Sequence, residues 1–230
     1  ILEQVQNQID EEGKNAERLL LRGKILLGKG EVRSALDDLL AARKLAKDDI
    51  TRESLRGTLF QALIDQTRQI DEKTPAFLKQ ANEIALGESE QMQVLERFVW
   101  YYTQQGSPIE AFKFARKFAD SARSGLIDCP SDIDLKVSAE RWFAGKVLDL
   151  WQAASDEEKK VITAEFEAES KKVGEEPKAV NGLLRLYGQL PAADSVWHKY
   201  AELLAVKGDW QKAETILLRL SDAESRVAAD

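Results

Sequence analysis

The sequence has little of what side-chain catalysis or metal binding requires. It contains one histidine, His198, and one cysteine, Cys129, in 230 residues. A Ser/His/Asp or Cys/His arrangement would have to be built around these two residues, which lie far apart in the sequence. They also supply too few ligands for a zinc site unless two carboxylates join them. We therefore predict a chain that is not an enzyme, with no catalytic residue, metal site or cofactor. We interpret His198 as a helix-surface side chain and Cys129 as a packing or loop residue.

Turn residues, paired cysteines and long apolar runs are also scarce. The 13 glycines and 5 prolines are far fewer than an all-β protein with many turns requires, which favours an all-α fold. A single cysteine excludes an intrachain disulfide and leaves the compartment open. No apolar stretch approaches the ~20 residues needed to cross a bilayer, so we expect no membrane span in this chain.

Charge of one sign is nowhere concentrated enough for a nucleic-acid surface. The net charge is −7, and no Lys/Arg cluster stands clear of neighbouring Asp and Glu, so we expect no nucleic-acid partner. The acidic clusters at 9–14 and 155–160 lack the alternating ligands of a calcium loop. We interpret both as solvated helix starts, and Ser155 with Glu158 as a capping box.

Apolar residues at helical spacing run along most of the chain. They predict about eleven helices and no convincing strand, with the longest loop at 124–134. Most helices form pairs joined by short turns, which are helical hairpins. The predicted elements are helices around 19–27 and 32–45, at 50–71 and 74–86, at 89–105 and 108–124, then around 135–151, 155–173, 178–189 and the closing hairpin at 194–220.

An internal repeat emerges when Gly30 is aligned with Gly208. The window 16–49 then lies over 194–227, and the window 92–125 joins them when it is aligned on Gly106. The turn glycines permit the backbone to leave one helix and reverse. Small residues are expected where the two helices of a hairpin cross, and large ones around the crossing. The small residues are Gly23, Ala35, Ala201 and Ala213, and the large ones include Trp197, Tyr200, Leu204 and Leu217.

The pattern "W..YA..L...GDW..A" at 197–213 resembles the tetratricopeptide repeat, a helix–turn–helix of 34 residues. The resemblance implies a right-handed α-α superhelix, an irregular solenoid of five to six hairpins, over a single domain at 1–230. It implies a non-enzymatic scaffold that binds a protein or peptide and is monomeric or weakly associated. The sequence departs from the family in lacking a proline after Leu45 and Leu220 and in the unequal lengths of its middle hairpins.

A second, looser resemblance rests on residues 19–46 together with 185–220. These segments look like helical parts of large bacterial proteins that also carry a β-propeller of the pyrroloquinoline-quinone-enzyme type. That resemblance implies a scaffold outside the cytoplasm; without it we expect a cytoplasmic protein. The chain opens without Met and closes in a helical pattern, so we interpret it as part of a longer protein. The alternative function is a helical accessory domain of a larger enzyme, such as the superhelical arm of a lytic transglycosylase.

The aromatic run at 98–102 predicts a partner surface. If Phe98 and Tyr102 face the core, the 100° step per residue directs Trp100 to the opposite side of its helix. In a tetratricopeptide hairpin that side is the concave surface, although packing against the adjacent hairpin is the alternative. The Lys/Asn clamp that some family members use for a terminal carboxylate is not reproduced. By the same offset the predicted surface comprises Lys24, Leu27, Glu96, Trp100, Thr103, His198 and Glu202.

Overall fold

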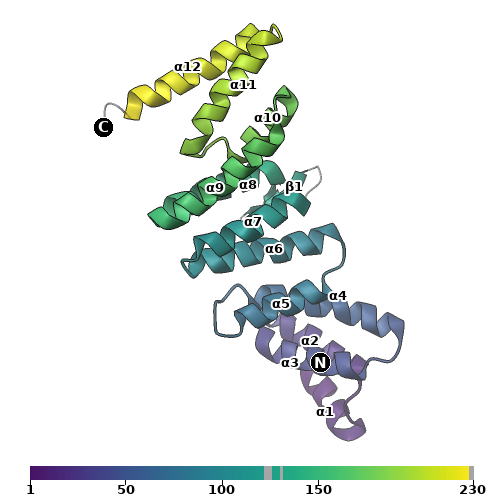
Figure 1. The fold of residues 1–230 in the computed structure, drawn as a ribbon. Helices are drawn as coiled ribbons and strands as arrows, with labels where there is room; N and C mark the ends of the chain where they lie inside the picture. Colours follow the sequence, from purple (N-terminus) through teal and green to yellow (C-terminus); the bar gives the residue numbers. More distant parts are fainter. Residues whose placement is uncertain (122–125, 130–131, 228–230) are drawn as a thin grey trace. The chain divides into compact units, whose positions relative to one another are not determined.

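The computed structural model describes residues 1–121, 126–129 and 132–227, with side chains described for 1–120 and 136–221 (Figure 1). Its contacts divide the chain into two compact units, Ile1–Phe98 and Val99–Asp230. The division falls inside one helix, and each unit is described by itself. That the whole chain is one repeat domain, and a right-handed superhelix, stays a prediction.

The N-terminal unit is a succession of helices in which α1 to α5 each pack on the next. Within it α1 packs on α2, α2 on α3, α3 on α4 and α4 on α5, and α2 also touches α4. Leucines from α2, α3 and α4 dominate its core, where Leu19, Leu39, Leu59 and Leu63 are each at most 1% exposed. The helices are α1 (Leu2–Glu12), α2 (Ala16–Gly28), α3 (Val32–Leu45), α4 (Asp49–Gln66), α5 (Thr74–Ile84) and the first part of α6 (Gly87–Gln104).

The C-terminal unit is also helical, and its described residues include one antiparallel pair of short strands. Its core is aromatic: the Tyr187 ring lies 5.4 Å from that of Phe143 and 5.7 Å from that of Phe166. Burial raises the pKa of Tyr187 to about 12. The elements after α6 are α7 (Pro108–Ser121), β1 (Leu126–Cys129), β2 (Asp132–Ser138), α8 (Ala139–Ala153), α9 (Asp156–Val173), α10 (Pro177–Tyr187), the 3-10 turn η1 (Pro191–Ala193), α11 (Asp194–Val206) and α12 (Trp210–Val227).

The predicted helix boundaries rest on identifiable local interactions. Gly30, Gly106 and Gly208 have φ of +78°, +63° and +86°, the left-handed region that lets the chain reverse after a helix. The capping box at the start of α9 is confirmed, because the Ser155 hydroxyl accepts from the Glu158 backbone N–H and the Glu158 carboxylate accepts from that of Ser155. Both features depend on a few neighbouring residues, which explains why these helix ends could be predicted from the sequence.

The small residues predicted at the helix crossings lie where the helices meet. A Cβ on Gly23 of α2 would come within 2.9 Å of Leu39 Cδ2 on α3. In the closing hairpin Ala201 and Ala213, 1% and 4% exposed, form one buried cluster with Leu204. At the crossing, each hairpin therefore has a residue no larger than alanine on its first helix.

Two elements differ from the sequence-based expectation. The acidic cluster at 9–14 was predicted to be a helix start, but Glu11 and Glu12 are the last residues of α1, a helix that the apolar pattern did not reveal. The antiparallel strands β1 and β2 occupy part of the predicted loop at 124–134, and β2 also replaces the start of the helix predicted from 135; Ile127 pairs with Val137. The expectation of no strand was wrong there, although the all-α class holds. Cys129 ends β1, and its side chain lies outside the described residues.

Among the described residues, no helix combines the length and apolar character needed to cross a membrane.

Candidate functional site

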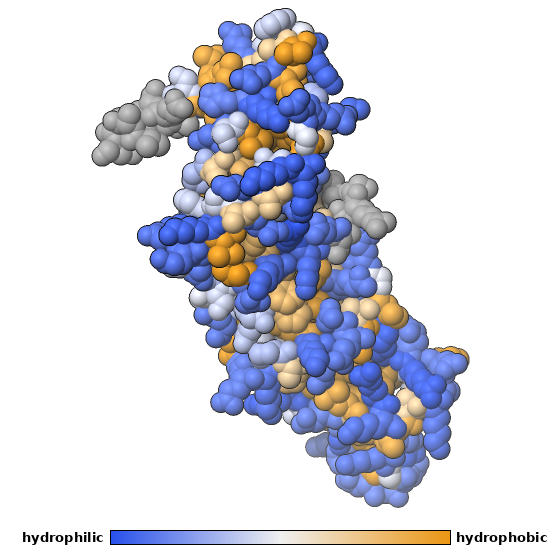
Figure 2. Space-filling model, viewed as in Figure 1, coloured by the Kyte–Doolittle hydropathy of each residue, from blue (hydrophilic) through white to orange (hydrophobic). Residues whose placement is uncertain are grey.

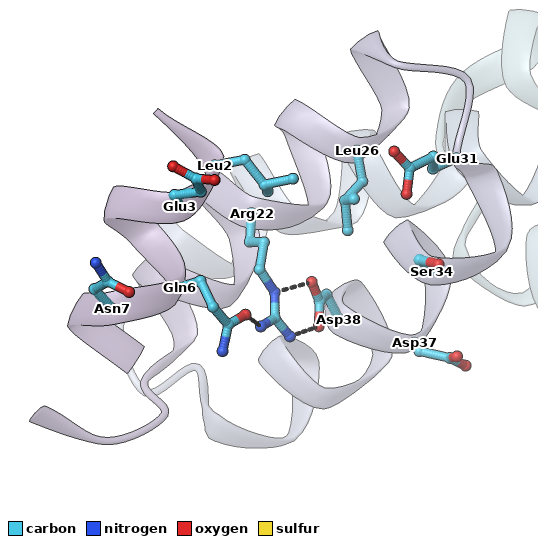
Figure 3. A pocket seen from close by; sticks show the side chains of 10 residues that line it. All are labelled: Leu2, Glu3, Gln6, Asn7, Arg22, Leu26, Glu31, Ser34, Asp37 and Asp38. Carbon is cyan, nitrogen blue, oxygen red and sulfur yellow. Dashed lines mark hydrogen bonds and ion pairs between the residues drawn. The ribbon is translucent and has the colours of Figure 1, made fainter. Parts of the chain in front are cut away.

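A hollow of about 500 Å³ opens in the N-terminal unit beside α1, α2 and α3 (Figure 3). Four carboxylates and one guanidinium line it, so its balance of charge is acidic. The lining residues are Leu2, Glu3, Gln6, Asn7, Arg22, Leu26, Glu31, Ser34, Asp37 and Asp38.

The centre of this hollow is an ion pair between Arg22 of α2 and Asp38 of α3 (Figure 3). Arg22 Nε donates to Asp38 Oδ2 at 2.6 Å, and a second guanidinium N–H donates to the other carboxylate oxygen. The remaining arm of the guanidinium donates to the Gln6 side-chain carbonyl on α1. Asp38 is only 6% exposed, so this bidentate geometry supplies the compensation that a buried charge requires. The pair therefore holds three helices together.

The chemistry available in the hollow is limited. The hydrogen bond to Asp38 raises the pKa of Arg22 above its ordinary value, so Arg22 remains a cation and cannot exchange a proton. The exposed carboxylates do not converge, and Figure 3 shows Asp37 directed away from the ion pair. Within the described part of the chain, no group of three or more His, Cys, Asp or Glu side chains is placed to hold a metal ion. The hollow is best explained as a site of helix packing.

A second hollow, of about 470 Å³, lies beside α4 in the same unit and is lined by Arg43, Arg52 and Arg56 among others. Arg56 Nη1 donates to the Glu90 carboxylate at 2.7 Å and to the Ile84 backbone carbonyl at 3.3 Å. The hydrogen bond to Glu90 raises the pKa of Arg56. Because Ile84 ends α5, this guanidinium satisfies a free helix carbonyl, and its role is structural.

Three residues of the predicted concave surface belong to the N-terminal unit. Lys24 is exposed, and its Nζ donates to the Ser54 hydroxyl on α4 at 3.1 Å. Leu27 is half-buried against the leucine core. Glu96 forms an ion pair with Arg97 at 3.7 Å. Of the three, only Lys24 stands exposed.

The other four residues belong to the C-terminal unit. Trp100 is half-buried, and the Thr103 hydroxyl donates to the Val99 carbonyl at 2.8 Å. His198 and Glu202 lie exposed on α11, one turn apart. A single concave surface made of all seven residues stays a prediction.

An apolar face that the sequence did not predict lies on α12. Trp210, Leu217 and Leu218 are 68%, 43% and 60% exposed, and they follow one another at helical spacing. Figure 2 shows orange, apolar residues among blue ones where Figure 1 places α11 and α12. Leu217 was expected to fill space around the helix crossing, and the structure corrects this. Trp210 was assigned to the repeat pattern, but no described neighbour buries it.

The repeat alignment identifies which residues of the first hairpin correspond to this face. It matches Trp210 to Val32 and Leu217 to Leu39, and the Leu39 side chain is fully buried. Leu39 shares one buried cluster with leucines of α4, a third helix that packs on α3. A pattern within one hairpin does not specify whether a third helix is present, so exposure could not be predicted from it.

Comparison with known proteins gives no relative to guide the assignment: no family model, no curated protein and no solved structure matches this chain.

Proposed function

We propose that this chain is a non-enzymatic scaffold that binds other proteins through tetratricopeptide-like helical hairpins. The observation that carries the proposal is the exposed apolar face of the closing hairpin, formed by Trp210, Leu217 and Leu218. Exposed patches of this kind on folded proteins mark interaction sites. A tryptophan surrounded by aliphatic side chains is also the composition of binding hot spots.

The architecture supports the same proposal. The hairpins α2–α3 and α11–α12 share a turn glycine with positive φ and small residues at the crossing. Repeated hairpins present long surfaces made of many side chains, which suits them to protein recognition. The predicted concave surface around Trp100 is the second candidate region for a partner.

The test is site-specific photocrosslinking in an extract of the source organism. A photoreactive phenylalanine analogue replaces Trp210, or Trp100, or the exposed Val161 on α9 as the matched control. We expect one protein to crosslink at position 210 or 100 in saturable fashion, and not at 161. The captured protein, once purified, should form a complex of fixed stoichiometry with the unmodified chain.

Absence of any protein captured at 210 or 100 beyond the control would contradict the scaffold proposal. A captured small metabolite that the chain converts to a product would contradict its non-enzymatic character.

A further inference from the structure

The hollow beside α4 combines an apolar floor with charged side chains. The floor consists of Leu55 and Leu59 of α4 and Ile84 at the end of α5, which are 2%, 1% and 7% exposed. Its volume of about 470 Å³ is that of a small-molecule site, and such sites combine an apolar lining with a few polar groups that orient the ligand. The charged residues that line it are Arg43, Asp49, Arg52, Glu53 and Arg56.

One of the three guanidinium groups, that of Arg56, is already used by the fold. The Arg56 side chain is only 22% exposed. Its Nη1 donates to the Glu90 carboxylate and to the Ile84 carbonyl, and its Nε donates to Glu53 Oε1 at 3.2 Å. Its charge is therefore compensated by two carboxylates, and we assign it no part in binding a ligand.

The other two guanidinium groups are held weakly or not at all. Arg43 of α3 is exposed and forms no hydrogen bond or ion pair with any residue that the structure describes. Arg52 of α4 is 59% exposed, and it donates to the Ala46 carbonyl at 3.3 Å and to Asp49 Oδ1 at 3.2 Å. Exposed ion pairs of this kind stabilise a fold little, so a ligand carboxylate can replace that of Asp49 at small cost.

We infer that this hollow binds a small amphipathic carboxylate, an aliphatic molecule that ends in a carboxylate group. The aliphatic part lies on Leu55 and Leu59, and the carboxylate accepts hydrogen bonds from Arg43 and Arg52. A guanidinium presents paired N–H donors that match the two oxygens of a carboxylate. The inference adds a ligand to the proposed scaffold and does not depend on the scaffold function.

The size and charge of the hollow favour this ligand over the alternatives. The leucines of the floor are one helical turn apart, about 6 Å along α4, whereas a bound helix or strand needs a longer groove. The carboxylates of Asp49 and Glu53 are 98% and 66% exposed, so they extend towards solvent. A cationic ligand would bring its charge to Arg43, which has no counter-charge among the described residues.

The test is an NMR titration of the full chain, labelled with ¹³C at its leucine methyl groups, with three molecules of equal chain length. Hexanoate carries the aliphatic chain and the carboxylate. Hexanol keeps the chain without the charge, and hexylammonium reverses the charge. The methyl signals of Leu55 and Leu59 report where each molecule binds.

We expect hexanoate to shift these two sets of signals in saturable fashion in the millimolar range. Hexanol and hexylammonium should bind at least about fivefold more weakly at low salt. The double variant Arg43→Gln/Arg52→Gln should weaken hexanoate binding by about tenfold, because both charged donors are lost.

Two single variants complete the test. Arg52→Lys keeps the charge without the planar fork, so it should lose less affinity than the double variant. Arg68→Gln is the matched control and should leave binding unchanged. Arg68 is likewise an exposed arginine of the N-terminal unit, paired with Asp65 at 3.1 Å, but it does not line the hollow.

Three outcomes would overturn the inference. They are the absence of saturable shifts with hexanoate, equal binding of hexanol, and unchanged binding in the double variant when its circular dichroism shows that it is folded. An acetylated Leu-Leu-Glu peptide that displaces hexanoate at a lower concentration would assign the hollow to a protein segment and overturn the inference as well. Crosslinking at Trp210 and Trp100 tests the scaffold function separately, so either proposal can fail while the other stands.

Discussion

The two hairpins α2–α3 and α11–α12 follow one repeat register but close in chemically different ways. In α2–α3 the crossing is flanked by the buried ion pair Arg22–Asp38. The corresponding residues of α11–α12 are Tyr200 and Ile216, which pack as partly buried apolar side chains around Ala201 and Ala213. The comparison teaches that the small residue at the crossing and the turn glycine define the hairpin. The pair beside the crossing can be ionic or apolar.

The same hairpins also differ in what surrounds them. Helices α1 and α4 both pack on α2–α3, and α1 contributes Gln6 to the Arg22 guanidinium. On α11, by contrast, α10 and η1 pack from one side, while the face of α12 that carries Trp210 stays exposed. The ion pair Arg22–Asp38 thus lies in the hairpin α2–α3, on which two further helices pack. In the hairpin α11–α12 the exposed side chain of Trp210 lies on a face that no further described helix covers.

The largest expected effect comes from breaking the ion pair. Arg22→Ala leaves the Asp38 carboxylate buried without its counter-charge, which should cost about 3–5 kcal/mol of unfolding free energy. Far-UV circular dichroism in a urea series measures it. All five tryptophans lie between residues 100 and 210, in the C-terminal unit, so tryptophan fluorescence should change little.

The double variant Arg22→Tyr/Asp38→Ile is the control, because it transfers the apolar pair of the last hairpin into the first. Replacing a buried ion pair by apolar residues is often neutral or stabilising. If the double variant is as unstable as Arg22→Ala, the two hairpins do not share a register.

Truncating the leucine at the same repeat position in each hairpin should show how much burial by a further helix contributes to stability. Leu39→Ala removes a fully buried side chain and should cost about 2–5 kcal/mol. Leu217→Ala, at the corresponding but half-open position, should cost less than half as much, because its side chain keeps much of its contact with water in the folded state. Urea unfolding of both variants measures the gap. Equal costs would mean that Leu217 is buried in solution.

Overpacking tests the crossing of the last hairpin. Ala213→Leu inserts three carbon atoms where α12 meets Ala201 and Leu204, which should cost about 1–3 kcal/mol. Tryptophan fluorescence follows this unit during thermal unfolding. Glu214→Leu, one residue further along and exposed, is the control that should leave the melting temperature nearly unchanged. An unchanged melting temperature for Ala213→Leu would show that the helices do not cross there.

The smallest expected effect is the pH dependence of the helix that covers the first hairpin. Asp48 caps α4, and its hydrogen bonds to Thr51 lower the pKa of its carboxyl from the ordinary value of 3.8. The stabilisation is therefore fully present above pH 3.8 and is lost as the pH falls through the lowered folded-state pKa. Asp48→Asn keeps a cap but should flatten this part of the stability curve. A carboxyl that titrates at its ordinary value by NMR would contradict the cap.

Much of the fold could be predicted because its signals are local. Gly30, Gly106 and Gly208 mark turns whatever lies around them, and the Ser155–Glu158 capping box is contained in four residues. Helix α1 escaped prediction because it buries only Val5 and Ile9, too few for a recognisable period. The strand β2 did leave a signal, since apolar and polar residues alternate strictly over Asp132–Ser138.

The candidate site was less predictable because it depends on neighbours distant in sequence. The spacing of Arg22 and Asp38 in the sequence does not predict a bidentate ion pair, because the two residues lie on different helices. The exposure of Trp210 depends on the third helix that covers one hairpin and not the other. The repeat alignment shows which residues of the two hairpins correspond. Only the packing of whole helices shows which of these residues are exposed to solvent.

Hydrogen–deuterium exchange of the intact chain tests the central claim most directly. It compares the amides of α3 with those of α12 in one experiment. Helix α12 should exchange faster than α3, because α4 packs only on the latter. Equal protection of the two helices would contradict the account of one covered and one open hairpin.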